Sequence, residues 1–315
     1  MRNYLTRLTG AALAAVTLIA GPVAAEYPER PVEFVVPWPP GDIEDVLTRL
    51  IADAVQEKYG VPSAVVNRPG GGGGPFPGAI SVATAPADGY TIGSFVIGVP
   101  VTGPTLGIPE LTPNPFEPLG IFMTYPFMIA APKDAPYSTM EELAAYAQEN
   151  DVSLGHFGAG LPPTRVTFAV AQKLGFEFAS EAAFDNVDCN VLASGDVDVI
   201  NTTLQQVSAC RDDLTILVTI GAERTALTPD VPTVTEIEPK IDLFLWNGLF
   251  VHKDVPQEAR DVIIEVAKEV IAGEEAQQLA AQSGTLVYWQ DAEAATAQIE
   301  GDIATVIMIG ELLGD

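Results

Sequence analysis

The sequence predicts an α/β protein built from two lobes, with the chain crossing between the lobes twice. Short apolar segments rich in β-branched residues alternate with segments in which apolar residues recur at helical spacing. Strand–helix–strand order of this kind produces mostly parallel sheets with helices on both faces. Two long apolar runs, at residues 119–132 and 244–252, interrupt the alternation, and these are the two expected crossings.

The first lobe is predicted to open with a βαβαβ order. Residues 32–37 are short, apolar and β-branched, and apolar residues then recur at helical spacing from 46 to 59. The remaining elements are expected to be a strand at 63–67, a loop at 68–78, a short helix at 79–86 and a strand at 90–98.

The second lobe repeats the alternation. It is expected to contain strands at 153–157, 177–184, 197–203 and 214–221, a helix after the first of them, and a short helix at 188–194. Residues 257–313 are predicted to be mostly helical. The first lobe would then comprise residues 26–122 and 245–315, and the second lobe residues 123–244.

The first 25 residues have the pattern of a cleavable secretory signal peptide. Arg2 and Arg7 precede a short apolar run, and the small residues 23–25 suit a cleavage site before Glu26. The alternative is an uncleaved anchor, which is less favoured because the run is shorter than the ~20 residues of a spanning helix. We therefore expect an exported, periplasmic protein.

The charge of the chain excludes several partners. It carries 42 acidic and 15 basic residues, a net charge of −27, which becomes −29 when Arg2 and Arg7 are removed with the leader. Nucleic acids and anionic membranes require a basic surface, so neither is an expected partner. An anionic ligand would meet a repulsive long-range field and would have to be held by short-range, oriented N–H groups.

The two cysteines, Cys189 and Cys210, can form a disulfide in an oxidising compartment, and the sequence leaves their pairing open. Such a loop of ~20 residues would contribute roughly 3 kcal/mol. With only two histidines and no Cys/His cluster, no structural zinc is expected, and no cofactor is predicted.

No catalytic constellation is recognisable, so we expect no enzyme. His156 and His252 lie on different predicted elements, and no Gly-x-Ser-x-Gly turn precedes a helix. The glycine run 70–74 lacks the Lys-Ser/Thr ending of a phosphate-binding loop, and no helix is expected directly after it. It is read as a permissive loop that places Phe76 as an apolar wall of a cleft.

The first turn, between the strand at 32–37 and the following helix, has an unusual charge. A helix start attracts anions, yet this one carries Asp42, Glu44 and Asp45. Asp42 could cap the helix, with Asp45 favouring the helix dipole. Alternatively, Asp42 could accept a hydrogen bond from a hydroxyl or ammonium group of a ligand, and both readings can hold together.

Polar and aromatic residues elsewhere have two readings each. The loop 155–160 could cradle an anion, with His156 adding an N–H donor or a charge, or His156 could be an ordinary packed histidine. Residues 201–203 follow a buried strand and could contact a ligand or cap a helix. Trp38, Phe157 and Phe184 could stack on a flat ligand or belong to the core.

Several motifs, in order, resemble the solute receptors of tripartite tricarboxylate transporters, the TctC or Bug receptors. The resemblance covers nearly all of the chain after the leader, and the order of the motifs is more specific than any single one. They are the turn at residues 37–45, the Asn-Arg-Pro-Gly loop at 67–73, Ala-Pro-x-Asp-Gly-Tyr-Thr at 85–91, the glycine loop at 155–160, Gly-x-Val-Asp at 195–198, Pro-Asp-Val-Pro-Thr at 229–236 and Trp-x-Gly-Leu at 246–249.

The resemblance implies a type II periplasmic-binding-protein fold of the Venus-flytrap kind. It implies a monomeric receptor that delivers a small di-, tri- or substituted carboxylate to a tripartite-type membrane permease. It also implies that loops 38–42 and 155–160 clamp the ligand, largely through backbone N–H groups and water. The implied ligand contacts are Trp38, Pro39, Pro40, Gly41, Asp42, Phe76, Ile97, His156, Phe157, Gly158, Ala159, Gly160, Phe184, Thr202 and Thr203.

The sequence departs from the family pattern at expected ligand contacts. Asp42 replaces a glycine, residues 96–98 replace Thr-Ser-Gly, His156 replaces a serine, and Thr164 replaces a histidine. The solute is therefore less certain than the fold. The alternatives are a receptor for a zwitterionic or cationic solute, suggested by the acidic first turn, and a secreted α/β enzyme.

Overall fold

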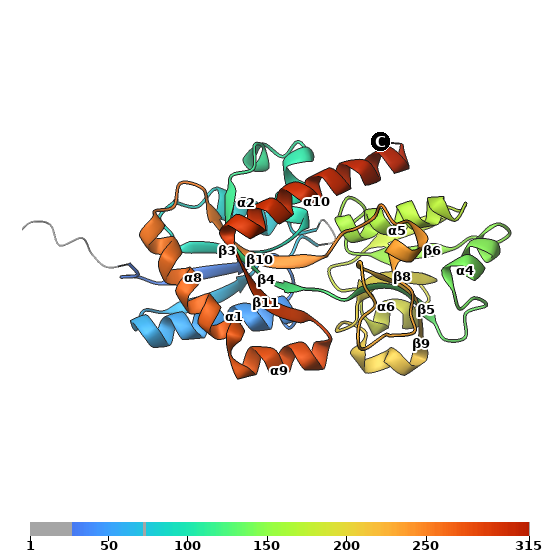
Figure 1. Ribbon diagram of the computed structural model, residues 1–315, viewed down its shortest axis with the longest axis horizontal. Helices are drawn as coiled ribbons and strands as arrows, with labels where there is room; N and C mark the ends of the chain where they lie inside the picture. The colour runs from blue at the N-terminus through green and yellow to red at the C-terminus, as the bar shows by residue number, and fades with distance from the viewer. Residues whose placement is uncertain (1–26, 72–73, 315) are drawn as a thin grey trace, which may run out of the picture.

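A computed structural model describes residues 27–71 and 74–314, and the predicted signal peptide lies outside them. Figure 1 shows two α/β bodies side by side along the long axis of the molecule, each with its own sheet. This confirms the predicted two-lobed α/β fold. Among the described residues, no helix combines the length and apolar character needed to cross a bilayer.

The sheet of the first lobe has six strands in the order β11-β4-β10-β3-β1-β2. β1 pairs in parallel with β2 and β3, whereas β10 runs antiparallel to β3 and β4. The antiparallel members arrive from distant parts of the sequence, which makes this lobe discontinuous in the chain. The strands are β1 (Val32–Val36), β2 (Ser63–Asn67), β3 (Thr91–Val96), β4 (Phe116–Thr124), β10 (Trp246–His252) and β11 (Leu286–Asp291).

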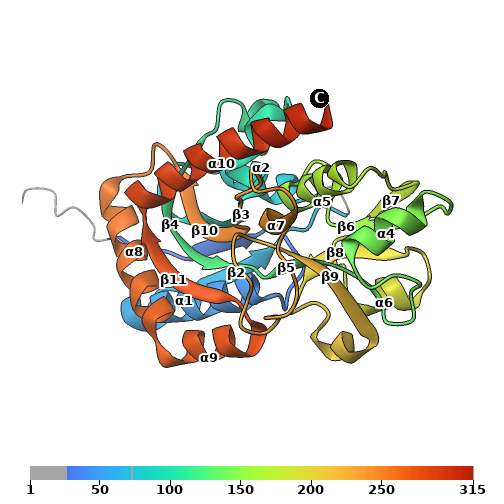
Figure 2. The same cartoon turned by 45° about the vertical axis from the view of Figure 1, so that its right-hand side comes forward.

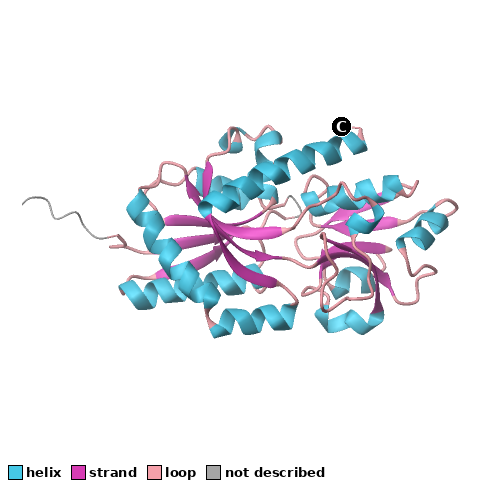
Figure 3. Ribbon diagram, in the orientation of Figure 1, coloured by secondary structure: helices cyan, strands magenta, loops and turns pink. Residues whose placement is uncertain are grey.

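Helices cover both faces of this sheet (Figure 3). In α1 (Ile43–Tyr59), the apolar side chains of Leu47, Ile51 and Val55 recur at helical spacing and are fully buried. Each contributes roughly 1.5–3 kcal/mol to the burial free energy. The other helices of this lobe are α2 (Phe76–Ala83), α3 (Gly98–Val101), α8 (Gln257–Ala272), α9 (Glu274–Ser283) and α10 (Ala292–Leu313), with short 3-10 turns at Gly103–Thr105 and Pro109–Leu111.

The sheet of the second lobe has five strands in the order β7-β6-β8-β5-β9. β6 pairs in parallel with β7 and β8, and β5 runs antiparallel to β8 and β9. The strands are β5 (Phe127–Pro132), β6 (Ser153–His156), β7 (Ser180–Ala183), β8 (Val199–Thr203) and β9 (Leu214–Ile220); the helices are α4 (Met140–Ala147), α5 (Pro162–Lys173), α6 (Cys189–Ala193) and α7 (Val234–Ile237), with a 3-10 turn at Ser208–Asp213.

The apolar run 119–132 is two strands in different sheets. β4 ends at Thr124 in the first sheet, and β5 begins at Phe127 in the second. Pro126 stands between them, and proline has no N–H to continue a ladder. The return crossing leads into β10. In Figures 1 and 2, α10 starts over the first lobe, and its C-terminal end lies beside α5 of the second lobe.

The second predicted helix begins earlier than expected, at Phe76 rather than residue 79, directly after the glycine loop. Pro75 occupies the N-cap position, and Pro77 lies in the first turn, where a missing N–H costs no helical hydrogen bond. A Cβ on Gly78 would lie 2.7 Å from Pro37 Cβ, so glycine is needed for α2 to pack against the end of β1. The expectation of no helix directly after the glycine run was therefore wrong.

Cys189 and Cys210 form a disulfide that joins the start of α6 to the 3-10 turn before β9. The bridge spans 21 positions of sequence. It ties together two short elements that follow β7 and β8 at one end of the second sheet.

Replacing both cysteines by serine should lower the free energy of unfolding by about 3 kcal/mol, because the unfolded chain regains the freedom of a 21-residue loop. Urea denaturation of the oxidised protein and the double variant would measure this. Equal unfolding free energies would contradict the prediction, and reduced wild-type protein should match the variant.

Candidate functional site

A partly open cavity of about 50 Å³ lies between the two lobes. The first lobe and the crossing contribute Trp38, Asp42, Glu44, Ile97, Tyr125 and Trp246 to its wall. The second lobe contributes Phe127, Phe157, Leu161, Pro162, Pro163 and Thr203, and the two glutamines that follow β8 also contact the cavity.

Asp45 holds the loop between β1 and α1 in place. Its side chain is 2% exposed, and Oδ2 accepts hydrogen bonds from Gly41 N at 3.0 Å and from Arg49 Nε at 3.0 Å. Its Oδ1 accepts from Arg49 Nη2 at 2.9 Å and from Asn67 Nδ2 at 2.8 Å. Asn67 Nδ2 also lies 3.0 Å from Trp38 O. One carboxylate therefore connects the loop, the first turn of α1 and the end of β2.

Asp42 occupies the N-cap position of α1, but its side chain makes no capping hydrogen bond. The carboxylate instead accepts from Gln206 Nε2 of the opposite lobe, at 2.9 Å to Oδ1 and 3.0 Å to Oδ2. The expected side-chain cap is therefore wrong, because the carboxylate faces the other lobe. Burial raises the pKa of Asp42 from 3.8 to about 6, although the Gln206 hydrogen bond opposes the shift.

Glu44 is the most deeply buried acid of the cavity, with an exposed fraction of 3%. Burial and the neighbouring Asp42 carboxylate raise its pKa well above the usual value, while a hydrogen bond from the Tyr125 hydroxyl opposes the shift. Among the described residues that line the cavity, none is Lys, Arg or His. Arg49 is the basic partner of Asp45, whereas no basic residue of the lining pairs with Asp42 or Glu44.

A chain of polar side chains leads from the cavity into the core of the first lobe. The Tyr125 hydroxyl lies 3.4 Å from Asn247 Oδ1, and Asn247 Nδ2 donates to Ser94 Oγ at 2.8 Å. Ser94 Oγ in turn lies 2.8 Å from Thr48 Oγ1 on α1. This chain orients Tyr125, which sits between β4 and β5 where the chain crosses from lobe to lobe.

Aromatic rings form much of the cavity wall. Trp38 meets Phe157 edge-on across the interface at 5.7 Å between centroids, and Phe157 lies 5.9 Å from Phe127. Tyr125 packs edge-on against Phe127 at 5.7 Å. The buried indole Nε1–H of Trp38 has no hydrogen-bond partner among the described residues. The site therefore offers several aromatic surfaces and one unused donor.

The start of α5 forms the second-lobe side of the cavity. Leu161 is its N-cap residue, Pro162 and Pro163 form its first turn, and that turn contains no acidic residue. A helix start carries a partial positive charge. The adjacent Thr164 hydroxyl is fully buried and has no partner in the described part of the chain. This wall therefore has the opposite electrostatic character from the acidic start of α1.

Further contacts hold the lobes together. Besides the Asp42–Gln206 pair, Gln205 Nε2 donates to Gly41 O at 3.3 Å, and Gly71 N donates to Asp185 Oδ2 at 3.0 Å. A Cβ on Gly98 of the first lobe would lie 3.0 Å from the Leu161 side chain. The structure is thus in a closed arrangement.

Five of the residues expected to bind the ligand line the cavity: Trp38, Asp42, Ile97, Phe157 and Thr203. The others belong to the same loops and strands but do not line it. They are Pro39, Pro40, Gly41, Phe76, His156, Gly158, Ala159, Gly160, Phe184 and Thr202.

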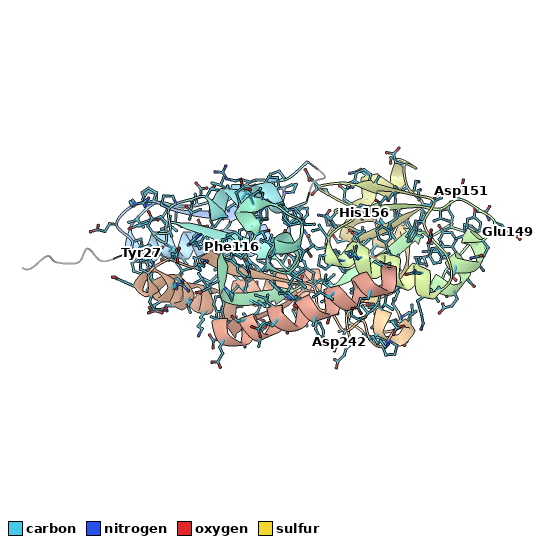
Figure 4. The ribbon with its side chains drawn as sticks, turned by 90° about the horizontal axis from the view of Figure 1, so that it is seen from above. Tyr27, Phe116, Glu149, Asp151, His156 and Asp242 are labelled. Carbon is cyan, nitrogen blue, oxygen red and sulfur yellow. A yellow bond between two sulfur atoms is a disulfide. The ribbon has the colours of Figure 1, made fainter. Side chains whose placement is uncertain are left out.

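His156 is a packed histidine of the second-lobe core. It ends β6, is 1% exposed, and lies within the body of that lobe in Figure 4. Its Nδ1 accepts from Gly158 N at 2.9 Å, and its Nε2 lies 3.1 Å from Glu181 Oε2. Burial lowers its pKa despite the Glu181 carboxylate. A ring nitrogen that accepts an N–H indicates the neutral form, with the proton on Nε2.

The polar end of β8 is mainly internal. Asn201 Nδ2 donates to Thr167 Oγ1 at 2.9 Å, and the Thr202 hydroxyl donates to Val187 O. Both residues are fully buried, and only Thr203 of this group contacts the cavity. These residues therefore fasten β8 to α5 and to the segment before α6.

Sequence reasoning missed Tyr125, Phe127, Gln205, Gln206 and Trp246 as cavity residues. Tyr125 and Phe127 stand within an apolar run, where aromatic residues are usually core. The two glutamines follow the predicted strand directly, which was the available signal. Glu44 was noticed for its charge, but its burial was not foreseen. The described residues contain no group of three or more His, Cys, Asp or Glu side chains that could hold a metal ion.

Comparison with known proteins identifies the family. Residues 47–306 match the model described as tripartite tricarboxylate transporter family receptor. A protein encoded in the gbd 5′ region of Cupriavidus necator is 31% identical over 250 residues, covering 75% of this chain and 74% of that protein. BugT of Bordetella pertussis is 28% identical, covering 70% and 69%.

Solved structures share the fold. The periplasmic binding protein BugD is 26% identical with a TM-score of 0.79, covering 91% of this chain and 99% of that one. MatC from Rhodopseudomonas palustris, solved with malate, has a TM-score of 0.78 at 22% identity, covering 90% and 99%. R. palustris Rpa4515, solved with adipate, has a TM-score of 0.79 at 22% identity, covering 92% and 99%.

The family match begins at Leu47, so the acidic first turn lies before the matched residues. The two lobes, the cavity between them and the match over most of the chain agree with one another. The chain belongs to the receptor family of the tripartite tricarboxylate transporters.

Proposed function

We propose that this protein is a periplasmic receptor, monomeric and exported by a cleavable signal peptide, that binds a small organic acid carrying a hydroxyl, ammonium or similar donor group. It would deliver this solute to a membrane permease of the tripartite tricarboxylate type. The observation that carries the proposal is the cavity whose walls come from both lobes, since a solute held there would stabilise the closed form.

The ligands of two solved structures and an unpaired donor in the cavity wall support the carboxylate part of the proposal. MatC and Rpa4515 were solved with malate and adipate, which are both dicarboxylates. The Trp38 indole N–H has no partner among the described residues, and the start of α5, which carries the positive end of the helix dipole, lines the cavity. A buried donor without a partner is costly, and a carboxylate oxygen would satisfy it.

The donor part of the proposal is supported by Asp42 and Glu44. Both line the cavity, and none of the described lining residues is basic. A plain carboxylate brings no hydrogen-bond donor to these two acids and is repelled by whichever of them is ionised. A solute that also carries a donor would satisfy their acceptor oxygens.

Isothermal titration against small di-, tri-, keto-, hydroxy- and amino acids should detect binding of at least one hydroxy or amino acid, with plain acids weaker. Native mass spectrometry of the purified protein would show a retained solute directly. Silence across the whole panel, with no retained solute, would contradict the proposed ligand class.

The free energy of unfolding should fall as the pH rises, because Asp42 ionises in the folded protein. Its folded pKa of about 6 exceeds 3.8, so the penalty for ionising it is absent below pH 4, grows between pH 4 and 6, and is complete above that. Asp42→Asn should therefore raise the unfolding free energy at pH 7.5 by about 1–3 kcal/mol and change it little at pH 4. Urea denaturation at both pH values measures this, with exposed Asp53→Asn on the same helix as control. An equal effect at both pH values would refute the prediction.

Asp45→Ala should lower the free energy of unfolding by about 2–4 kcal/mol, because it removes the acceptor of Gly41 N and Asn67 Nδ2 and the partner of Arg49. Solute affinity should fall as well, since the loop carrying Trp38 and Asp42 loses its anchor. Denaturation and titration of the variant, compared with Asp53→Ala, would test both effects. A variant with the same free energy of unfolding as the control would show that this network does not stabilise the fold.

A further inference from the structure

The cavity is electrostatically polarised by the two helix starts that meet there. The first turn of α1 contains Glu44 and Asp45 and follows Asp42, whereas the first turn of α5 contains no acid. Arg49 neutralises Asp45 at 2.9 Å and leaves the other two carboxyl groups facing the cavity. The first-lobe wall is therefore negative, and the second-lobe wall carries the positive end of a helix dipole.

No cation of the described residues balances Glu44. The titratable groups that act on it are Asp42 and Asp45 at the start of α1 and Tyr125 between β4 and β5. None of them is positively charged, and burial raises the pKa of Glu44 well above its usual value. A buried carboxyl of this kind either keeps its proton or ionises against a cation brought by the ligand.

The aromatic rings beside these acids suit a cation. Tyr125, Phe127 and Trp246 line the same cavity as Asp42 and Glu44. The face of an aromatic ring attracts ammonium groups, and the attraction increases when a bound ligand displaces water from the rings. Hydroxyl donors gain no comparable advantage from such rings, so these walls favour a positively charged nitrogen.

One unpaired donor belongs to the cavity wall. The Trp38 indole N–H is buried without a partner among the described residues, and Pro162 and Pro163 at the start of α5 line the second-lobe wall. With the positive end of the α5 dipole, this donor suits one carboxylate. Acids against a cation and a donor against a carboxylate are the two requirements of a zwitterion.

We propose that this cavity selects a small zwitterion, an amino-acid-like or betaine-like solute, with its cationic nitrogen beside Glu44 and Asp42 and its carboxylate toward Trp38 and the start of α5. Glu44 is then the residue that determines specificity, and it supplies the charge that a plain acid would not tolerate. The inference rests on the proposed receptor function. A cavity of about 50 Å³ further favours solutes with few non-hydrogen atoms.

Matched pairs of probes test the inference, because each pair differs mainly in the charge of one atom. Glycine betaine is compared with 3,3-dimethylbutanoate, and alanine with 2-methylpropanoate, by isothermal titration at pH 7.5. In at least one pair, the zwitterion should bind at least tenfold more tightly than its carbon analogue. Preference for the plain acid in both pairs would overturn the inference.

Glu44→Gln separates charge from shape. Glutamine keeps the size of the side chain and an acceptor for the Tyr125 hydroxyl but cannot ionise. The variant should bind the preferred zwitterion at least tenfold more weakly, and the carbon analogue no more weakly than the wild type does. Glu57→Gln, which removes the same charge from an exposed position of α1, is the matched control and should bind like the wild type. Unchanged zwitterion affinity in a folded Glu44→Gln variant would overturn the inference.

Proton release gives a second readout that does not depend on a variant. A cation beside Glu44 favours its ionised form, so zwitterion binding at pH 7.5 should release protons. The heat of binding should then differ between phosphate and Tris in proportion to their ionisation enthalpies. No release, or uptake, would contradict the assigned position of the cation.

The outcomes separate this inference from the receptor function. If plain or hydroxy acids bind and no zwitterion is preferred, the receptor function stands and the zwitterion inference is overturned. If none of the acids or zwitterions binds, both are overturned. Zwitterion preference that is lost in Glu44→Gln and kept in Glu57→Gln supports both.

Discussion

The hydrogen-bonded ion pair of Asp45 with Arg49 is the interaction on which the site depends. Through Gly41 N and Asn67 Nδ2, the same carboxylate fixes the loop after β1 against the end of β2. Because Arg49 balances the negative charge of Asp45, burying this carboxylate adds no net charge to the cavity wall. Because Asp45 is satisfied within its own lobe, the loop presents Trp38 and Asp42 to the other lobe in a defined geometry.

Closure of the lobes has an electrostatic cost that follows from this arrangement. Asp42 exchanges water for Gln206, and the donors that remain for Glu44 among the described residues are its own backbone N–H and the Tyr125 hydroxyl. One amide donor does not replace the hydration of a carboxylate. The closed form is therefore stabilised by protonation or by a cationic group. In this receptor, the solute can act as the counter-ion that makes closure favourable, so recognition and closure are coupled.

The fold was largely predictable because local patterns specify it. Alternating strand and helix periodicity located most strands of both sheets, and the two apolar runs contain β4, β5 and β10 beside the crossings. Strand β11 was missed, because it lies inside the stretch 257–313 that was predicted to be mostly helical. The position of α2 was missed because prolines at its start resemble a loop. The site was less predictable, since it depends on contacts between distant segments: Asp42 and Gln206 are 164 residues apart in the chain. The same limit applies to His156, whose burial against Glu181 depends on strand pairing rather than on its own loop.

Asp42 contributes its charge to the cavity from a loop whose backbone is fixed by other residues. The loop is held by Asp45, Asn67 and the left-handed Gly41, which has φ = 108°. The Asp42 carboxylate points across the interface to Gln206 and shapes the field inside the cavity. Glu44 lies two residues after Asp42, in the first turn of α1. It adds a second, more deeply buried carboxyl group to the same wall of the cavity. Specificity in this clamshell is therefore set by the unpaired charges that the fixed loop brings into the closed space.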